Sequence, residues 1–190
     1  MKKLTLLVMG LSALCLSASA QESAPAGSSY PGKTSFYAEF GGPGVLFSAN
    51  IDTRFKKTHL GWGGRAGVGF VTVWDYRYDS INQPYYYYGR SYRQSIATFP
   101  VQVNYIFGKP SSPHTFEAGA GVTVLSKKAD VFNNYDYYDD QNPTQFFGTF
   151  SFMYRRQPVN GGFTWRIGFT PLIGNGFIQP SGGASVGYAF

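Results

Sequence analysis

The sequence predicts an all-β fold, an eight-stranded antiparallel β-barrel of the up-and-down type. Three observations predict it. Apolar residues alternate with small or polar ones in eight segments, turns alone separate the segments, and the two long connections fall on one side. Side chains two positions apart share one face of a strand, so a period of two indicates strands. Strands joined directly by turns pair antiparallel.

The predicted strands fill most of the chain after its first 32 residues: 33–40, 45–55, 61–74, 95–108, 115–125, 144–157, 162–173 and 181–190. In the fifth of these, Phe116, Val122 and Val124 share one face, and Glu117 and Thr123 share the other. An even number of antiparallel strands closes a sheet on itself and leaves no unpaired edge.

The connections between the predicted strands divide by length. The side that holds both chain ends carries three short turns, residues 56–60, 109–114 and 158–161. The opposite side carries two long loops and two short ones, residues 75–94, 126–143, 41–44 and 174–180. Closure makes the two short loops neighbours, so we expect one side of that rim to be low and the other tall. Short turns on one side and longer loops on the other are typical of transmembrane barrels.

The two long loops hold ten of the 15 tyrosines, among them Tyr85, Tyr86, Tyr87, Tyr88, Tyr135, Tyr137 and Tyr138. Tyrosine offers a large apolar face and a hydroxyl at low entropic cost, which favours it on binding surfaces. We expect the loops to bind surface glycans or proteins. The alternative is that the tyrosines only pack on each other.

Two prolines fall inside predicted strands. Pro100 and Pro171 lack a backbone donor, and each removes one ladder hydrogen bond. We expect both near the loop-side ends of their strands, where a bulge or an unpaired rim position accommodates them.

The two faces of the predicted strands differ in composition. One face carries Phe, Val, Trp, Ile and Tyr, and the other carries Gly, Ser, Thr and a few isolated charges. A soluble barrel such as a lipocalin turns its apolar face inward. Small residues suit the narrow interior of eight strands, and the apolar face suits lipid. The pattern therefore favours a transmembrane barrel, with interfacial aromatic girdles formed by Trp62, Trp74, Phe107, Phe163, Tyr188 and Phe190.

Seven charged side chains point inward by alternation: Glu39, Asp52, Arg54, Arg65, Glu117, Arg155 and Arg166. An unpaired buried charge is costly, so we expect these groups to pair into a network that plugs the lumen. The alternative for one or two of them is a solvated position at the rim.

The N-terminus indicates a signal peptide over residues 1–20. Lys2 and Lys3 precede the apolar run 4–16, and Ala18 and Ala20 supply a small-residue cleavage site. The run is too short to span a bilayer. Residues 21–32, rich in Ser, Ala, Pro and Gly, predict a flexible segment before a barrel over 33–190. The single cysteine, Cys15, lies inside the predicted signal, so the mature chain has no thiol chemistry.

The last ten residues form one predicted strand that ends on an aromatic residue, with Tyr188 and Phe190 on one face. This ending resembles the C-terminal assembly signal of outer-membrane barrel proteins. With the signal peptide, the strand pattern and the loop asymmetry, nearly the whole mature chain resembles the small eight-stranded outer-membrane β-barrel proteins of the OmpA-barrel and OmpX kind. The resemblance implies a location in the bacterial cell outer membrane, contact with its lipid, and recognition by the barrel assembly machinery. We expect a monomer.

We expect no enzymatic activity. Hydrolytic catalysis needs a nucleophile or activated water beside a base, often histidine, and the only two histidines, His59 and His114, lie in predicted turns. No G-x-S-x-G elbow is present, and the acidic residues around Asp139 match no known calcium loop. We therefore expect no metal and no cofactor.

The charge pattern argues against a nucleic-acid partner, because the net charge of +6 is spread over scattered basic residues. The function expected from the sequence is a structural or surface-binding barrel with a plugged interior. The alternatives are a narrow pore for small solutes and a lipid-modifying enzyme of the outer membrane.

Overall fold

The computed structural model describes residues 32–78, 89–129, 131–132 and 143–190. These residues form ten strands and one short 3-10 helix: β1 (Thr34–Gly41), η1 (Gly42–Gly44), β2 (Phe47–Arg54), β3 (Gly61–Tyr78), β4 (Gly89–Gly108), β5 (His114–Ala129), β6 (Thr144–Arg156), β7 (Gly162–Phe169), β8 (Leu172–Gly174), β9 (Phe177–Gln179) and β10 (Gly182–Ala189). No helix in the described residues is long and apolar enough to cross a membrane. The predicted signal peptide and flexible segment lie outside these residues, apart from Gly32.

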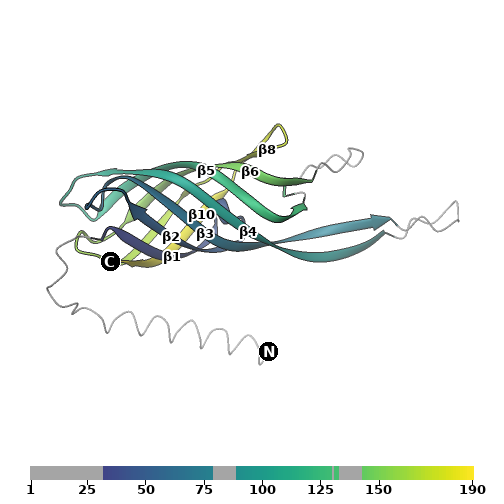
Figure 1. Ribbon diagram of the computed structural model, residues 1–190, viewed down its shortest axis with the longest axis horizontal. Helices are drawn as coiled ribbons and strands as arrows, with labels where there is room; N and C mark the ends of the chain where they lie inside the picture. Colours follow the sequence, from purple (N-terminus) through teal and green to yellow (C-terminus); the bar gives the residue numbers. More distant parts are fainter. Residues whose placement is uncertain (1–31, 79–88, 130, 133–142) are drawn as a thin grey trace, which may run out of the picture. The chain divides into compact units, whose positions relative to one another are not determined.

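Eight of these strands close an antiparallel barrel, which confirms the predicted fold class. The order around the barrel is β1–β2–β3–β4–β5–β6–β7–β10, and β10 pairs with β1. At this seam Thr34 and Phe190 exchange two backbone hydrogen bonds of 3.1 and 2.8 Å. The end of the barrel that holds Thr34, Phe190 and the three short connections is called the turn end, and the opposite end is called the loop end (Figure 1).

Some strand limits at the loop end differ from the predicted ones. β3 continues past Trp74 to Tyr78, β4 begins at Gly89 instead of Ser95, and β5 continues past Leu125 to Ala129. Residues 72–78 pair with residues 89–95 as a two-stranded ribbon, which Figure 1 shows projecting beyond the barrel wall. Tyrosine, valine and threonine favour extended backbone, so pairing continues where the sequence suggested a loop.

The seventh predicted strand, residues 162–173, is interrupted by a proline. β7 ends at Phe169. After Thr170 and Pro171 the chain continues as the hairpin of β8 and β9. Pro171 cannot donate a ladder bond, although its carbonyl accepts one from the Phe150 N–H at 3.0 Å. The prediction of a short loop over 174–180, and of a low rim there, is wrong, because these residues belong to a hairpin that turns at residues 175 and 176.

Pro100 lies toward the loop end, as predicted, two positions from Thr98, where the pairing of β4 with β5 ends. It lies opposite Thr123 of β5. On the other side, the pairing of β3 with β4 passes from Ala66 opposite Val101 directly to Gly69 opposite Thr98. The ladder between β3 and β4 is therefore interrupted at Pro100, which lacks the backbone donor, while the ladder between β4 and β5 continues.

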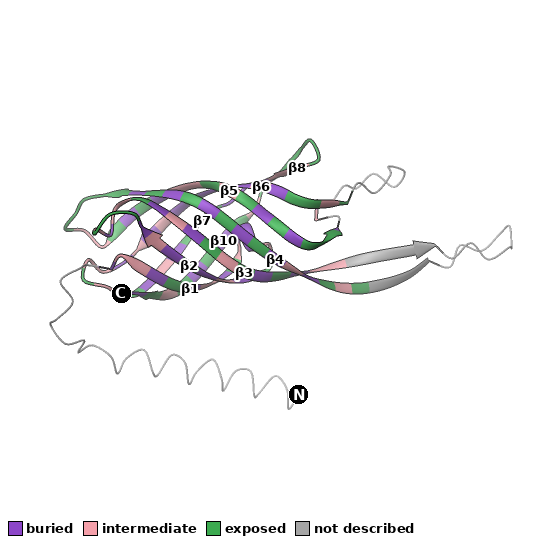
Figure 2. Ribbon diagram, in the orientation of Figure 1, coloured by how far each residue is buried: buried purple, intermediate pink, exposed green. Residues whose placement is uncertain are grey.

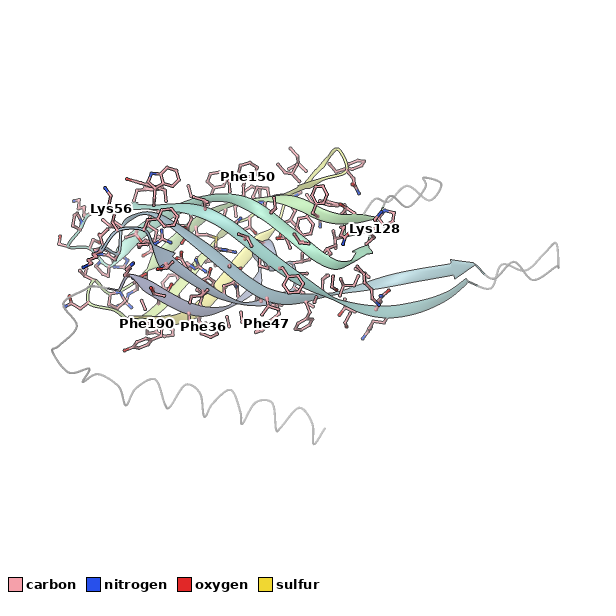
Figure 3. The ribbon with its side chains drawn as sticks, in the orientation of Figure 1. Phe36, Phe47, Lys56, Lys128, Phe150 and Phe190 are labelled. Atoms are coloured by element: carbon pink, nitrogen blue, oxygen red, sulfur yellow. The ribbon has the colours of Figure 1, made fainter. Side chains whose placement is uncertain are left out.

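Burial alternates along the strands in the reverse of the soluble pattern (Figure 2). Large apolar side chains point outward over the whole wall, and Figure 3 shows Phe36, Phe47 and Phe150 extending away from the barrel. Phe36 is 56% exposed and Phe152 is 56% exposed. The inward positions are mostly polar, charged or glycine. The side chains that a soluble protein would bury therefore cover the outside of this barrel.

The loop end contains the one apolar cluster inside the described part of the chain. Its buried members are Val71, Ile96, Leu125, Ala129, Phe132, Phe147 and Leu172. Val45 packs against it. Val45 falls inside the predicted strand 45–55, but β2 begins at Phe47 and Val45 adopts a φ of 75° in the connection. A conventional hydrophobic core therefore covers the interior where β3, β4 and β5 extend beyond the shorter strands.

The packing of Gly187 against Tyr37 provides a test of this interior. A Cβ at Gly187 of β10 would lie 2.2 Å from the Phe36 carbonyl oxygen and 2.4 Å from Tyr37 Cβ. We expect Gly187→Ala to lower the free energy of unfolding by about 1–3 kcal/mol through overpacking. The measurement is urea unfolding in detergent micelles, followed by tryptophan fluorescence. The matched control is Gly182→Ala in the same strand, where the nearest atom is 3.5 Å away. Equal losses in the two variants would contradict this packing.

Candidate functional site

The structure brings the seven inward charged residues together inside the barrel. They come from six positions around the wall: Glu39 from β1, Asp52 and Arg54 from β2, Arg65 from β3, Glu117 from β5, Arg155 from β6 and Arg166 from β7. Each is at most 3% exposed. The alternative in which one or two of them are solvated at the rim is wrong, because strand tilt brings all seven to the enclosed part of the barrel.

Two carboxylates organise the part of the network nearest the turn end. Asp52 pairs with its neighbour Arg54 and, at 2.7 Å, with Arg155. Glu117 pairs with Arg155 at 3.0 Å and with Arg166 at 3.2 Å. Each of the two carboxylates therefore bridges two guanidinium groups, and Arg155 joins both carboxylates.

Glu39 extends the network toward the seam of the barrel. It accepts a hydrogen bond of 2.9 Å from Arg65 and lies 3.9 Å from Arg166. The ring of Tyr37 lies beneath Arg166, whose guanidinium carbon is 3.5 Å from the ring centroid. A cation above an aromatic face is attracted to it, and more strongly where water is excluded. The network is therefore continuous from β2 through β5, β6 and β7 to β1 and β3.

Neutral polar side chains add hydrogen bonds to these charges. Asn104 donates to Glu117 at 2.8 Å and accepts from Arg54 at 2.8 Å. Ser185 accepts from Arg166 Nε at 2.9 Å, and Ser35 accepts from Arg155 at 3.1 Å. The network holds four arginines against three carboxylates, so the additional positive charge is shared with uncharged acceptors and the Tyr37 ring.

A second polar layer connects the network to the loop end. Gln102 donates to the Thr149 hydroxyl at 2.7 Å and accepts from the Ser151 hydroxyl at 3.3 Å. Above it, η1 lies inside the wall with all three of its residues buried. The Thr123 hydroxyl donates to the Pro43 carbonyl at 2.7 Å, and the Thr98 hydroxyl donates to the Gly44 carbonyl at 3.1 Å. The connection between β1 and β2 is thus anchored to β4 and β5 on another part of the wall.

The sequence missed η1 and the apolar cluster as parts of the interior. The turn at residues 41–44 was predicted, but its inward position depends on contacts with strands far away in the chain. The sequence did contain one signal. On the loop side of Pro100 and Gly121 the inward positions become apolar, as at Ile96 and Leu125, whereas the inward positions of the other strands are polar.

The aromatic residues predicted for a girdle gather mainly at the turn end. Trp62, Phe107, Phe163, Tyr188 and Phe190 are all exposed there. Trp62 and Tyr105 meet edge to face at 5.2 Å between ring centroids. Trp74 lies at the other end of β3. The role of Tyr188 and Phe190 as an assembly signal stays a prediction.

The two histidines lie apart at the turn end. His114 is exposed and its ring contacts the Tyr154 hydroxyl. His59 is 5% exposed, and burial, with a second contribution from the Arg155 charge, lowers its pKa below the usual value. No group of three His, Cys, Asp or Glu residues in the described ranges is arranged to hold a metal ion. The tyrosines predicted as a binding surface, Tyr85 to Tyr88 and Tyr135, Tyr137 and Tyr138, lie outside the described residues.

These features define a class of protein: a closed eight-stranded barrel with an apolar outside and an ionic inside. The structure is similar to the crystal structure of the N-terminal β-barrel domain of Pseudomonas aeruginosa OprF, with a TM-score of 0.51 and 12% sequence identity. The match covers 83% of this chain and 96% of the OprF domain. No family model and no curated protein sequence matches the chain. The similarity at this identity is a similarity of fold.

A double-mutant cycle on Glu117 and Arg155 measures the coupling inside the network. Glu117→Gln leaves Arg155 and Arg166 without a shared carboxylate, and we expect it to lower the free energy of unfolding by about 3–5 kcal/mol. The double variant with Arg155→Gln removes one charge of each sign. We therefore expect its loss to be smaller than the sum of the single losses by at least about 1 kcal/mol. Urea unfolding in detergent micelles gives all of these values.

The control for the cycle is Ser151→Ala, which removes one neutral hydrogen bond to Gln102. We expect it to cost about 1 kcal/mol. Strictly additive losses for Glu117→Gln and Arg155→Gln would show that the two charges do not stabilise each other.

Proposed function

We propose that this chain is a non-enzymatic barrel of the bacterial outer membrane with a closed interior and a structural role. The observation that carries the proposal is the inverted polarity of the wall. An outer surface of Phe, Val, Ile and Trp side chains around a charged interior is stable in lipid and unstable in water. In a bilayer every backbone polar group needs a partner within the protein, and a closed barrel supplies one.

The likeness to the OprF β-barrel domain supports the fold on which the proposed location rests. That domain is a β-barrel of the same fold class, and the match covers 96% of it. The described histidines lie at the turn end, which in this proposal faces the periplasm. Chemistry on lipids of the outer leaflet would require a base at the opposite end, so a non-enzymatic role is favoured.

A closed interior is supported by two separate layers. The salt-bridge network crosses the barrel, and η1 lies over it, held by Thr98 and Thr123. Ions would have to displace buried charge pairs in order to pass, which carries a high cost in free energy. We therefore favour a structural barrel over a narrow pore.

Membrane fractionation and planar-bilayer recording test this proposal together. We expect the folded chain in the outer-membrane fraction, with different gel mobility before and after heating, and no steady conductance. The variant Thr98→Val/Thr123→Val removes both hydroxyl donors to η1, so we expect it to raise the frequency of brief conductance steps. The matched control is Thr115→Val, whose hydroxyl donates to the Arg155 carbonyl at the turn end at 3.2 Å. A large, stable channel from the wild-type protein would rule out the closed interior and favour the pore.

A surface-binding role is a second candidate, favoured by the ribbon of β3 and β4. Its paired residues, 72–78 and 89–95, lie beyond Phe70 and Thr98, the last positions of these strands that pair with β2 and β5. Among the described residues, neither edge of the ribbon is paired with a further strand. Both edges are therefore open to a strand from another protein. The tyrosine-rich sequence between its two strands would add aromatic contacts.

Shortening the ribbon tests the surface-binding role. We expect replacement of residues 75–92 by Asn-Gly to leave the barrel folded and to abolish binding to one member of a panel of host matrix, neighbouring cells and surface polysaccharide. The control replaces residues 174–177 by Asn-Gly and so shortens the hairpin of β8 and β9. Unchanged binding across the panel, with the barrel still folded, would end the adhesion hypothesis.

A further inference from the structure

The charges outside the barrel are distributed unevenly between its two ends. Five cationic residues lie at the turn end: Lys33, Lys56, Lys57, Lys109 and Arg156. No Asp or Glu among the described residues accompanies them there. Glu39, Asp52 and Glu117 are all inside the barrel, and Asp75 lies in the distant part of β3. Among the described side chains outside the barrel, those at the turn end therefore carry an excess of positive charge.

Four of these cations are free of ion pairs within the described part of the chain: Lys33, Lys56, Lys109 and Arg156. Lys56 and Lys109 are exposed, and Lys33 and Arg156 are half-buried. Each comes from a different place on the perimeter, because Lys33 precedes β1, Lys56 follows β2, Lys109 follows β4 and Arg156 ends β6. The positive charge thus forms a ring around the barrel, not a patch that one small anion would fill.

The ring lies just beyond the aromatic side chains of the turn end. Phe55 directly precedes Lys56, Phe107 lies two positions before Lys109, and Arg156 is paired with Trp165. Figure 3 shows Lys56 and Phe190 at the same end of the barrel. Aromatic rings of this kind lie at the level of lipid headgroups, and lysine and arginine extend their charged ends from there toward water.

The loop end differs in its charge balance. The sequence of the two loop regions, residues 75–94 and 126–143, contains five Lys or Arg and six Asp residues. Lys127 and Lys128 are exposed on β5, but they belong to this nearly neutral set. The excess positive charge of the barrel surface is therefore confined to the turn end.

We propose that the turn end is a binding surface for anionic phospholipid headgroups of the leaflet that surrounds it. The inference rests on the membrane location proposed above. A ring of cations at headgroup depth matches a layer of phosphate groups around the barrel, and each Lys or Arg near such a layer strengthens the attraction about fivefold. The expected consequence is a shell of lipid enriched in phosphatidylglycerol or a similar anionic lipid, at the turn end only.

Tryptophan quenching by brominated lipids tests the inference directly, because Trp62 and Trp165 lie at the turn end. The protein carries Trp74→Phe, which removes the emission from the other end of β3. It is folded into vesicles of phosphatidylcholine and phosphatidylglycerol in equal amounts, with one of the two lipids brominated. We expect brominated phosphatidylglycerol to quench more strongly, with a relative binding constant several-fold above that of brominated phosphatidylcholine. High salt should reduce the difference.

The test variant is Lys56→Gln/Lys109→Gln, and the matched control is Lys127→Gln/Lys128→Gln. We expect the first to lower the preference for phosphatidylglycerol at least fivefold and the second to leave it nearly unchanged. Equal quenching by the two brominated lipids in the wild-type barrel, or equal loss in both variants, would overturn the inference. Absence of quenching by either lipid, with no heat-modifiable form, would instead contradict the membrane location itself.

Discussion

The constraint on which the rest of the structure depends is the pairing of backbone polar groups in a wall whose outside is apolar. Where lipid-like side chains cover the outer surface, an N–H or C=O group can find a partner only in the strand beside it. The seam between β1 and β10 is therefore as necessary as any turn, and Thr34 and Phe190 close it with two hydrogen bonds. The same constraint explains the effect of Pro171, which ends β7 where the ladder can pass to β8.

Closure with eight strands then determines what the interior can contain. The space is too narrow for water to solvate seven charges, so each charge must be compensated by a neighbour. Carboxylates that bridge two arginines achieve this with three acids for four bases, because a carboxylate has two oxygens and Asn104, Ser35 and Ser185 supply further partners. Glycines such as Gly187 leave room for the one large aromatic residue of this layer, Tyr37. The interior is a polar core that follows the same packing requirement as an apolar one.

The fold and the direction of most side chains could be predicted from the sequence, because a strand has a fixed period and closure needs an even number of strands. The alternation placed Glu117 and Arg155 on the inner face without any knowledge of their contacts. Which carboxylate meets which arginine could not be predicted, since it depends on the stagger between strands far apart in the chain, as for Asp52 and Arg155. Val45 and the hairpin of β8 and β9 escaped prediction for a related reason. Their positions are determined by the apolar cluster that they cover, and that cluster exists only after the barrel has closed.

The two ends of the barrel differ in the side chains that cover them. At the loop end, β3, β4 and β5 extend past their neighbours, and their inner faces are covered by an apolar cluster with η1 beneath it. At the turn end the strands stop together, and the surface is a layer of aromatic side chains followed by cations. The molecule is therefore asymmetric along its axis, with buried apolar contacts at the loop end and exposed charge at the turn end. In a membrane with two different leaflets, this asymmetry would give one orientation a lower free energy than the other, because only the turn end gains from anionic headgroups.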